Sequence, residues 1–259
     1  MRAGLAERIL APVITGLVLL AVFQLVASAG LISPSFSSPA AIALAGARAV
    51  ITVEFWSALG VTLSAWLIAV VIAVLLGAVL GVIIGSVPVL RELTRPVIEL
   101  LRPIPSVALI PLVVLTIGTQ SPSGIFLAVF AAFWQVLVSA IDGARSVDSV
   151  ARDTALTYRF SPLQRFWWVQ LPTAMPSLTT GLRLATSTAL ILVVTAEIII
   201  GVPGLGQQIS LSRSGAAPDR MYASILVIGL LGLALNLLVA GIERLLLRNH
   251  PRSRTGGRR

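Results

Sequence analysis

Long apolar stretches alternate with short polar segments along this sequence. A helix needs about 20 apolar residues to cross the hydrocarbon core of a bilayer, and about six segments approach or exceed that length. The pattern predicts an all-α, polytopic membrane protein with a single domain over residues 1–259. The predicted spans are residues 9–29, 56–87, 96–117, 124–141, 178–200 and 222–247, and a basic tail follows at residues 248–259.

The first apolar segment has two interpretations. Arg2 and Arg8 precede it, and Ala27-Ser28-Ala29 imitates the small-residue cleavage site of a secretory signal peptide. The apolar run of about 18 residues is longer than the 7–15 residues usual in such peptides. This length favours a retained span.

Small residues recur at every fourth position of the second predicted span. On a helix this spacing places them on one face, where another helix can approach closely. We therefore expect this face to pack against helices rather than to bind a ligand. The residues are Ala65, Ala69, Ala73, Gly77, Gly81 and Gly85.

Proline residues interrupt the third predicted span at Pro103, Pro105 and Pro111. Because proline removes a backbone donor, this helix is expected to be irregular. Irregular backbone at membrane depth is tolerated only against protein or a water-filled cavity. Arg102, Pro103 and Pro105 are therefore candidates for a translocation path or gate, and the alternative is a kinked helix that only packs.

Acidic side chains also occur inside the predicted spans. Glu197 lies three residues before the outer end of the fifth span, where it either lines a path or gate or makes structural hydrogen bonds. Glu99 lies at a depth similar to that of Arg102 and Arg183. Because charges inside membranes generally pair, we expect Glu99 to contact one of these two arginines.

Composition and charge agree with a membrane protein. Hydrophobic residues make up 57% of the chain and charged residues only 11%, which is unlike a soluble domain. The net charge is +9, and all 19 basic residues are arginine. With both termini inside, all of them except Arg48, Arg213 and Arg220 lie at the inner face, as the positive-inside rule expects. We therefore predict no nucleic-acid partner.

The residues needed for enzyme chemistry are missing from the sequence. It contains no cysteine, its one histidine is His250 in the tail, and it has no lysine for a phosphate-binding loop. Residues 204–206 (Gly-Leu-Gly) lack the third glycine and the preceding strand of a dinucleotide-binding motif. We predict that the chain is not an enzyme and binds no cofactor or metal of its own.

Residues 142–177 form the longest polar passage between apolar segments. Ser161 followed by proline is typical of a helix start, and two short helices are predicted, over residues 147–158 and 162–170, with a corner near Arg159. A folded element of this size between spans is predicted to dock a soluble partner. The second helix carries apolar residues that must rest on a surface: Leu163, Phe166, Trp167 and Val169.

This loop resembles the cytoplasmic loop of binding-protein-dependent ABC importer permeases. Their pattern is Glu-Ala-Ala, three residues, Gly, nine residues and Ile-x-Leu-Pro. Here residues 153–155 (Asp-Thr-Ala) stand for Glu-Ala-Ala, Arg159 for Gly, and residues 169–172 (Val-Gln-Leu-Pro) for the end. The acid is shortened, one alanine is threonine, and the glycine is replaced.

Two further stretches are similar to the nitrate/sulfonate/taurine branch of that family. They are residues 95–105 (Arg-Pro-Val-Ile-Glu-Leu-Leu-Arg-Pro-Ile-Pro) and Ala196-Glu197 followed by residues 204–206. The resemblance extends from about Thr62 to Arg248.

The resemblance implies a type I ABC importer permease fold with a cytoplasmic pair of coupling helices. It places the chain in the bacterial inner membrane, with both termini in the cytoplasm. The residues it assigns to ATPase coupling are Asp153, Thr154, Ala155, Tyr158, Arg159, Leu163, Phe166, Leu171 and Pro172.

The resemblance also implies the function and the partners. The chain would form the translocation path for a small anionic or polar organic solute, delivered by a periplasmic or lipid-anchored binding protein. A second permease, identical or not, and two ATPase subunits that bind ATP and Mg²⁺ would complete the assembly, surrounded by membrane lipid. The alternatives are an ion-coupled secondary transporter and a membrane scaffold without transport.

Arg159 replaces a glycine that would supply a left-handed backbone conformation at the end of the first loop helix. A residue with a Cβ atom costs about 1 kcal/mol or more there. Either Arg159 adopts this conformation or the corner is built differently. The departures at Asp153 and Thr154 favour a corner that is built differently. A loop changed in this way is compatible with a non-identical second permease that carries the intact motif.

Overall fold

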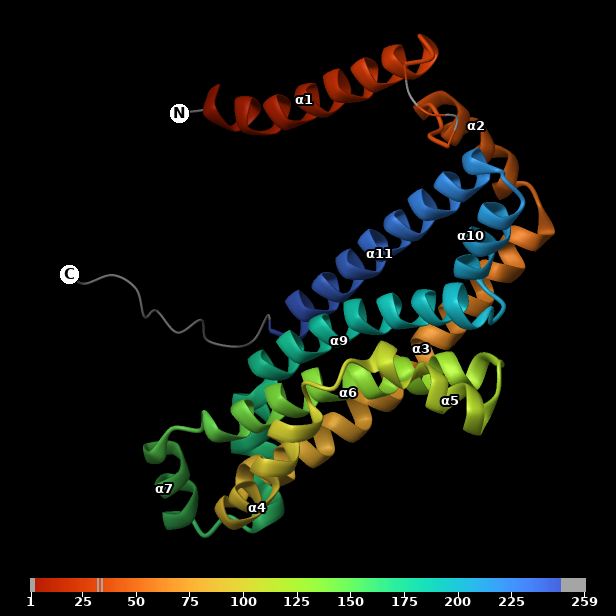
Figure 1. Cartoon of the computed structure of the whole chain (residues 1–259). Helices are drawn as coiled ribbons and strands as arrows, with labels where there is room; N and C mark the ends of the chain where they lie inside the picture. The colour runs from red at the N-terminus through yellow and green to blue at the C-terminus, as the bar shows by residue number, and fades with distance from the viewer. Residues whose placement is uncertain (1–2, 32, 34, 248–259) are drawn as a thin grey trace.

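The computed structural model describes residues 3–31, 33 and 35–247, and every regular element within them is helical (Figure 1). The predicted all-α class is confirmed. In chain order the elements are α1 (Ala3–Ser28), α2 (Pro39–Val50), α3 (Val53–Ser86), α4 (Pro88–Leu101), a 3₁₀ turn (Ser106–Leu109), α5 (Ile110–Ile117), α6 (Ser121–Arg145), α7 (Ser149–Thr157), α8 (Pro162–Arg165), a π-helical turn (Phe166–Gln170), α9 (Leu171–Ile200), α10 (Leu205–Ser214) and α11 (Pro218–Leu246).

Four helical segments of the described chain are long and apolar enough to cross a membrane, and the bent pair α4–α5 makes up to five. They contain α3, α6, α9 and α11. The sequence predicts about six spans, and the remaining one, the first (residues 9–29), corresponds to α1, whose apolar part, Ile14–Ser28, is a shorter helix. The predicted tail at residues 248–259 lies outside the described residues. Helix α10 is an element that the sequence analysis did not predict.

Side-chain caps fix the starts of α2 and α3. The Ser38 hydroxyl accepts the Ala41 N–H at 3.3 Å, and Pro39 occupies the first turn of α2. The Thr52 hydroxyl accepts the Phe55 N–H at 3.4 Å at the start of α3. Both contacts satisfy backbone donors that the first helical turn leaves without partners.

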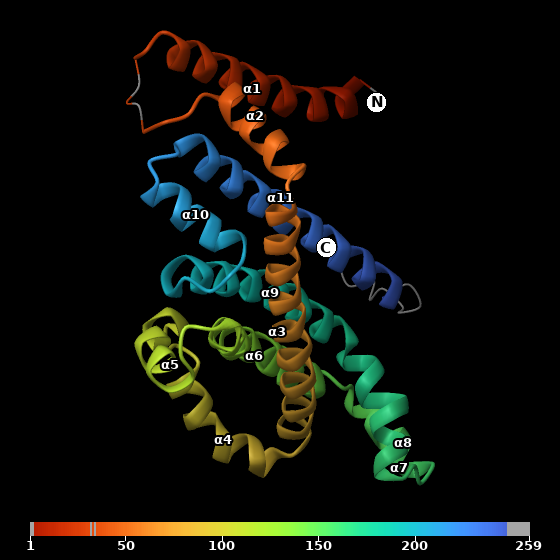
Figure 2. The ribbon, with the colours of Figure 1, turned by 90° about the vertical axis from the view of Figure 1, so that its right-hand side faces the viewer.

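Helices α3, α6 and α9 form the centre of the molecule, where α3 runs across the other two (Figure 2). Their contact buries alanine, valine and leucine side chains in one cluster, in which Ala69, Leu127 and Val193 are almost completely shielded. The Trp66 indole N–H donates to the Thr186 carbonyl at 3.0 Å, which satisfies a polar group inside this cluster.

The small-residue face of α3 lies against α6. All six residues of this face are buried, and the three glycines allow the closest approach. A Cβ atom at Gly81 would lie 2.5 Å from Ala140 Cβ and 2.6 Å from the Leu137 carbonyl oxygen. At Gly85 it would lie 2.7 Å from the Ile141 carbonyl oxygen. Backbone therefore meets backbone along this contact, and no ligand space separates the two helices.

The third predicted span is divided into α4, the 3₁₀ turn and α5. Helix α4 ends at Leu101, and the following helical segment departs from its axis by 77°. The break coincides with Pro103 and Pro105, which cannot donate backbone hydrogen bonds. The irregularity that the prolines predict is thus present as a sharp bend, and the 3₁₀ turn and α5 pack on α6.

Apolar side chains also cover the periphery of the described chain. Helix α1 packs on α2 and extends away from the bundle (Figures 1 and 2). Leu25 of α1 and Leu237 of α11 are both more than half exposed. Exposed apolar surface of this extent is typical of faces that lipid or another subunit covers.

Candidate functional site

The polar loop between α6 and α9 folds into two short helices. The Asp148 carboxylate accepts the Val150 N–H at 3.3 Å and caps α7. Ser161 and Gln164 form a reciprocal capping box: the Ser161 hydroxyl accepts the Gln164 N–H at 3.3 Å, and the Gln164 side chain accepts the Ser161 N–H at 2.8 Å. Local polar residues therefore define both helix starts.

The corner between these helices preserves the geometry expected for a glycine. Arg159 has φ = 54°, in the left-handed region. Its N–H donates to the Leu156 carbonyl, and the Phe160 N–H donates to the Ala155 carbonyl, both at 2.9 Å. These two bonds constitute a Schellman motif, which closes a helix through a left-handed residue. The prediction of a differently built corner is wrong: the backbone is retained, and only the side chain has changed.

The predicted coupling residues divide into an exposed and an inward group. Asp153, Thr154, Tyr158, Arg159 and Leu163 are exposed. Ala155 is buried, and Phe166, Leu171 and Pro172 are partly buried. The loop and the first turn of α9 therefore have one face directed toward the bundle and one exposed face.

Phe166 connects this loop to the bundle. It packs against a buried cluster of Val82 from α3 with Ala140 and Ala144 from α6. Of the apolar residues expected to rest on a surface, Phe166 does so within the chain, and Val169 is partly buried. Leu163 and Trp167 are exposed on this chain, so any surface on which they rest lies outside it.

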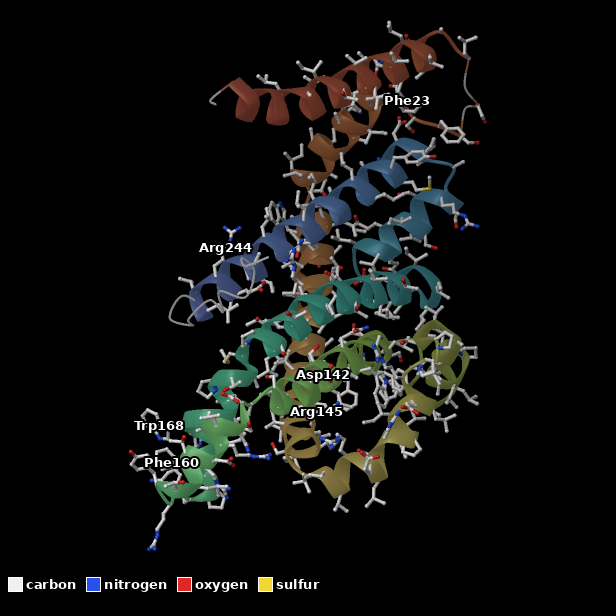
Figure 3. All side chains as sticks on the ribbon, turned by 90° about the vertical axis from the view of Figure 1, so that its left-hand side faces the viewer. Phe23, Asp142, Arg145, Phe160, Trp168 and Arg244 are labelled. Atoms are coloured by element: carbon white, nitrogen blue, oxygen red, sulfur yellow. The ribbon has the colours of Figure 1, made fainter. Side chains whose placement is uncertain are left out.

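Trp168 is a surface residue that sequence reasoning did not select. Its side chain is 76% exposed, and Figure 3 shows it with Phe160 at the outer edge of the loop. Leu163, Gln164, Trp167 and Trp168 line a shallow apolar depression there. Consecutive tryptophans in a polar loop are the signal that could have identified this surface, because large apolar exposure marks interaction sites.

Glu197 lies at a junction of three helices. It is 2% exposed, and its Oε1 accepts the Thr62 hydroxyl of α3 at 2.8 Å. Its Oε2 accepts the Gly206 N–H at 2.8 Å, while the Thr62 hydroxyl accepts the Leu205 N–H at 2.9 Å. The Glu197–Thr62 pair therefore satisfies the first two donors of α10.

The glycines around this junction make room for the carboxylate. A Cβ atom at Gly204 would overlap the Glu197 side chain, and Gly204 has φ = 153°. A Cβ atom at Gly206 would lie 2.6 Å from the Val194 carbonyl oxygen. The Gly-Leu-Gly sequence thus serves a buried helix start, and Glu197 makes the structural hydrogen bonds that the sequence left open as an alternative to a gate.

The other candidate path residues lie at the bend of the third segment. Arg102 is the residue that directly follows α4. Its side chain is exposed, as are those of Pro103 and Pro105. These three residues do not contact the Glu197 carboxylate, whose hydrogen-bond partners are Thr62 and Gly206.

The expected partners of Glu99 are wrong. Its Oε1 accepts the Arg95 Nε–H at 2.8 Å, one helical turn away on α4. Arg183 instead donates its Nε–H to Asn236 Oδ1 at 3.2 Å, which joins α9 to α11. Arg95 lies four residues before Glu99 on the same helix. Oppositely charged side chains at this spacing commonly pair.

Comparisons with known proteins agree with this architecture. The family described as "Binding-protein-dependent transport system inner membrane component" matches residues 73–249. The chain is 33% identical over 233 residues to the taurine transport system permease protein TauC of Escherichia coli (strain K12), and the alignment covers 88% of this chain and 85% of that protein. It is 28% identical over 150 residues to the nitrate import permease protein NrtB of Synechocystis sp., with 58% and 54% covered.

A solved structure shows the same fold. The chain is similar to one in the inward-facing MetNI methionine ABC transporter, with a TM-score of 0.65, 17% identity, and coverage of 74% of this chain and 96% of that chain.

Proposed function

Because the chain belongs to the inner-membrane components of binding-protein-dependent transport systems, we propose that it forms half of the path by which a small, anion-bearing solute crosses the membrane. The chain is the permease of an ABC importer and not itself the ATPase, which is a partner subunit. It is a multi-pass protein of the inner membrane. Family membership decides against the secondary transporter and the scaffold.

The observation that carries the coupling role is the exposed apolar surface of the loop. Tyr158, Leu163 and Trp168 are each more than two-thirds exposed, while Phe166 fastens the same loop to α3 and α6. Such a surface fits a cleft on the ATPase subunit. Closure of two ATPase subunits would then move the attached spans as rigid bodies.

The solute class is inferred from relatives and from charge inside the spans. The similar proteins named above carry taurine and nitrate, and both solutes present an anionic oxygen group. Arg183 lies within the span of α9, is exposed on this chain, and is held by Asn236. Because intramembrane arginines generally face a cavity or a partner, Arg183 and Arg102 are the side chains best suited to face an anion on the path.

The assembly requires further subunits. We propose an extracytoplasmic solute-binding protein, two ATPase subunits and a second permease, which is either a copy of this chain or a non-identical one. Since the corner at Arg159 keeps its backbone geometry, the loop offers no structural reason to require a non-identical partner. We propose that the loop and both termini lie in the cytoplasm, as the positive-inside rule expects.

The test of this function is reconstitution of the transporter with and without its coupling surface. The permease is combined with its ATPase and binding protein in lipid, and substrate-stimulated ATP hydrolysis is measured. Leu163→Asp is expected to lower this stimulation about tenfold or more, because a central apolar anchor carries much of the binding energy of an interface. Leu31→Asp, at an equally exposed site after α1, is the matched control.

Two results would contradict the proposal. One is ATP hydrolysis by the purified permease without any ATPase subunit. The other is an equal loss of stimulation in the Leu163→Asp and Leu31→Asp transporters.

A further inference from the structure

A cavity of about 180 Å³ lies where the loop between α6 and α9 (residues 146–170, the docking loop) meets the ends of the bundle helices. Its wall comes from the α3–α4 junction, the end of α6, α7, and the segment from α8 to the π-helical turn. Four arginines line it: Arg91, Arg145, Arg152 and Arg165. None of the described residues that line it is acidic.

The positive charge of this cavity is only partly balanced. Arg91 Nε lies 3.8 Å from Glu92 Oε1, and Glu92 itself is largely exposed. The only other ion pair among the described residues joins Arg95 and Glu99 on α4. Three of the four lining guanidinium groups therefore have no carboxylate within ion-pair distance in the described chain. Asp148, which follows the lining residue Val147, caps α7 through the Val150 N–H.

One buried donor of a residue in the cavity wall is evidence for a bound ligand. The Nε atom of Arg165 is buried and has no hydrogen-bond partner among the described residues. A buried donor without a partner is unfavourable, and in native proteins such groups generally have a ligand, an ion or water as partner. Because Arg165 also lines the cavity, an oxyanion bound there would lie beside this guanidinium group.

We propose that this four-arginine cavity binds an oxyanion of the phosphate type. The guanidinium group presents parallel donors whose spacing matches two oxygens of a phosphate, and arginine clusters are the usual means of holding such groups. Ser86 and Gln170 add polar groups to the wall and hydrogen-bond to each other at 3.4 Å. The bound oxyanion joins the docking loop to the ends of α3 and α6.

The place of the cavity favours the headgroup of an anionic phospholipid as the source of this oxyanion. Gly85 and Ser86 end α3, and Ala144 and Arg145 end α6, so the cavity opens where these spans leave the bilayer. Basic pockets at the cytoplasmic ends of spans collect anionic headgroups. This assignment relies on the proposed function only for the side of the membrane on which the cavity opens.

The experiment measures binding to the permease–ATPase complex after removal of lipid in a neutral detergent. Phosphatidylglycerol, phosphatidylcholine or inorganic phosphate is then added. Native mass spectrometry counts bound lipid, and hydrogen exchange follows residues 149–170 with each addition. The variants are Arg165→Gln and Arg165→Lys, and the control is Arg244→Gln. The control removes the same charge from an exposed position near the end of α11, outside the cavity wall and outside the docking loop.

The wild-type complex is expected to retain phosphatidylglycerol in preference to phosphatidylcholine, with slower exchange in the loop. Arg165→Gln should weaken this binding about tenfold, the effect of losing a charge-assisted hydrogen bond. Arg165→Lys should fall between the two, because it keeps the charge and loses the planar fork. If Arg165→Gln does not fold, the milder Arg165→Lys variant provides the test. Arg244→Gln should bind like the wild type.

Other outcomes are equally informative. Loop protection by inorganic phosphate alone, dependent on Arg165, supports the oxyanion site with a free ion as its source. Equal weakening by Arg244→Gln, or no binding of either oxyanion by the wild type, overturns the proposal. A carboxylate of the ATPase lying between Arg152 and Arg165 in the assembled complex also overturns it. Because no transport is measured, failure here is distinguishable from failure of the importer function.

Discussion

Single residues set the geometry at both ends of this molecule. At one end, Arg159 adopts a left-handed conformation so that the loop can turn from α7 to α8. At the other end, the Glu197 carboxylate and the Thr62 hydroxyl supply acceptors for the start of α10. In both places one side chain or one backbone angle decides how two elements meet.

Replacement of Arg159 by glycine should stabilise the corner. The left-handed conformation costs a residue with a Cβ atom about 1–2 kcal/mol, and the added freedom of glycine in the unfolded chain returns part of this gain. We expect a net gain of up to about 1 kcal/mol, measured as slower hydrogen exchange in residues 149–157. Thr157→Gly, inside α7, should have the opposite effect. Faster exchange in the Arg159→Gly protein would show that the arginine side chain stabilises the corner.

Replacement of Thr62 by valine tests the junction with Glu197. Valine has a similar shape but no hydroxyl, so Leu205 N–H loses its acceptor and Glu197 loses a donor. We expect a loss of about 1–3 kcal/mol of stability, seen as a lower thermal unfolding midpoint of the detergent-purified protein. Thr62→Ser should retain most of the stability. Ser64→Ala is the control, because Ser64 is exposed and bonds only within its own helix. An unchanged midpoint for Thr62→Val would contradict the assigned role.

At the scale of elements, α3 is the helix that organises the bundle. Its small-residue face allows α6 to approach until backbone atoms meet, and Trp66 joins it to α9. The bend between α4 and α5 follows from prolines that break the backbone ladder. The π-helical turn at Phe166–Gln170 leads directly into α9, so the docking loop and α9 are continuous.

Replacement of Gly81 by alanine should destabilise the contact between α3 and α6. The new methyl group would lie 2.5 Å from Ala140 Cβ, and overpacking of this kind costs about 1–3 kcal/mol. Gly60→Ala in the same helix meets nothing within 4 Å and should gain up to about 1 kcal/mol from helix propensity. The thermal midpoints of the two variants should therefore shift in opposite directions. Equal shifts would mean that the contact is looser than the structure shows.

On the scale of the whole molecule, α9 connects two distant regions. Helix α10, which begins at the Glu197–Thr62 pair, lies near one end of α9, and α7 of the docking loop lies near the other (Figure 1). The four-arginine cavity belongs to the loop end. Because Phe166 packs on α3 and α6, the proposed coupling would transmit a displacement of the loop to the central helices. This arrangement suits a permease whose spans move as bodies when a partner closes.

The orientation of the chain can be tested with two cysteine substitutions, since the sequence contains no cysteine. Ser149→Cys lies on the exposed start of α7, and Ser214→Cys lies at the exposed end of α10. In cells with a permeabilised outer envelope but intact inner membrane, a membrane-impermeant maleimide should label the second cysteine and not the first. Labelling of both after lysis is the control, and the reverse pattern would invert the proposed orientation.

The sequence by itself determined the membrane class, most helices, the small-residue face of α3 and the family. Hydropathy, capping residues such as Ser161 and the spacing of Ala65 to Gly85 express local requirements, which each segment carries in its own residues. Only the tertiary structure decided that Thr62 meets Glu197, 135 positions away, that α10 begins on this pair, and that Arg183 joins Asn236. It also decided that four arginines from separate segments share one cavity. Such contacts depend on how helices cross. The residue pattern of one segment shows which face is apolar, but it does not specify which other helix that face will meet or at what position.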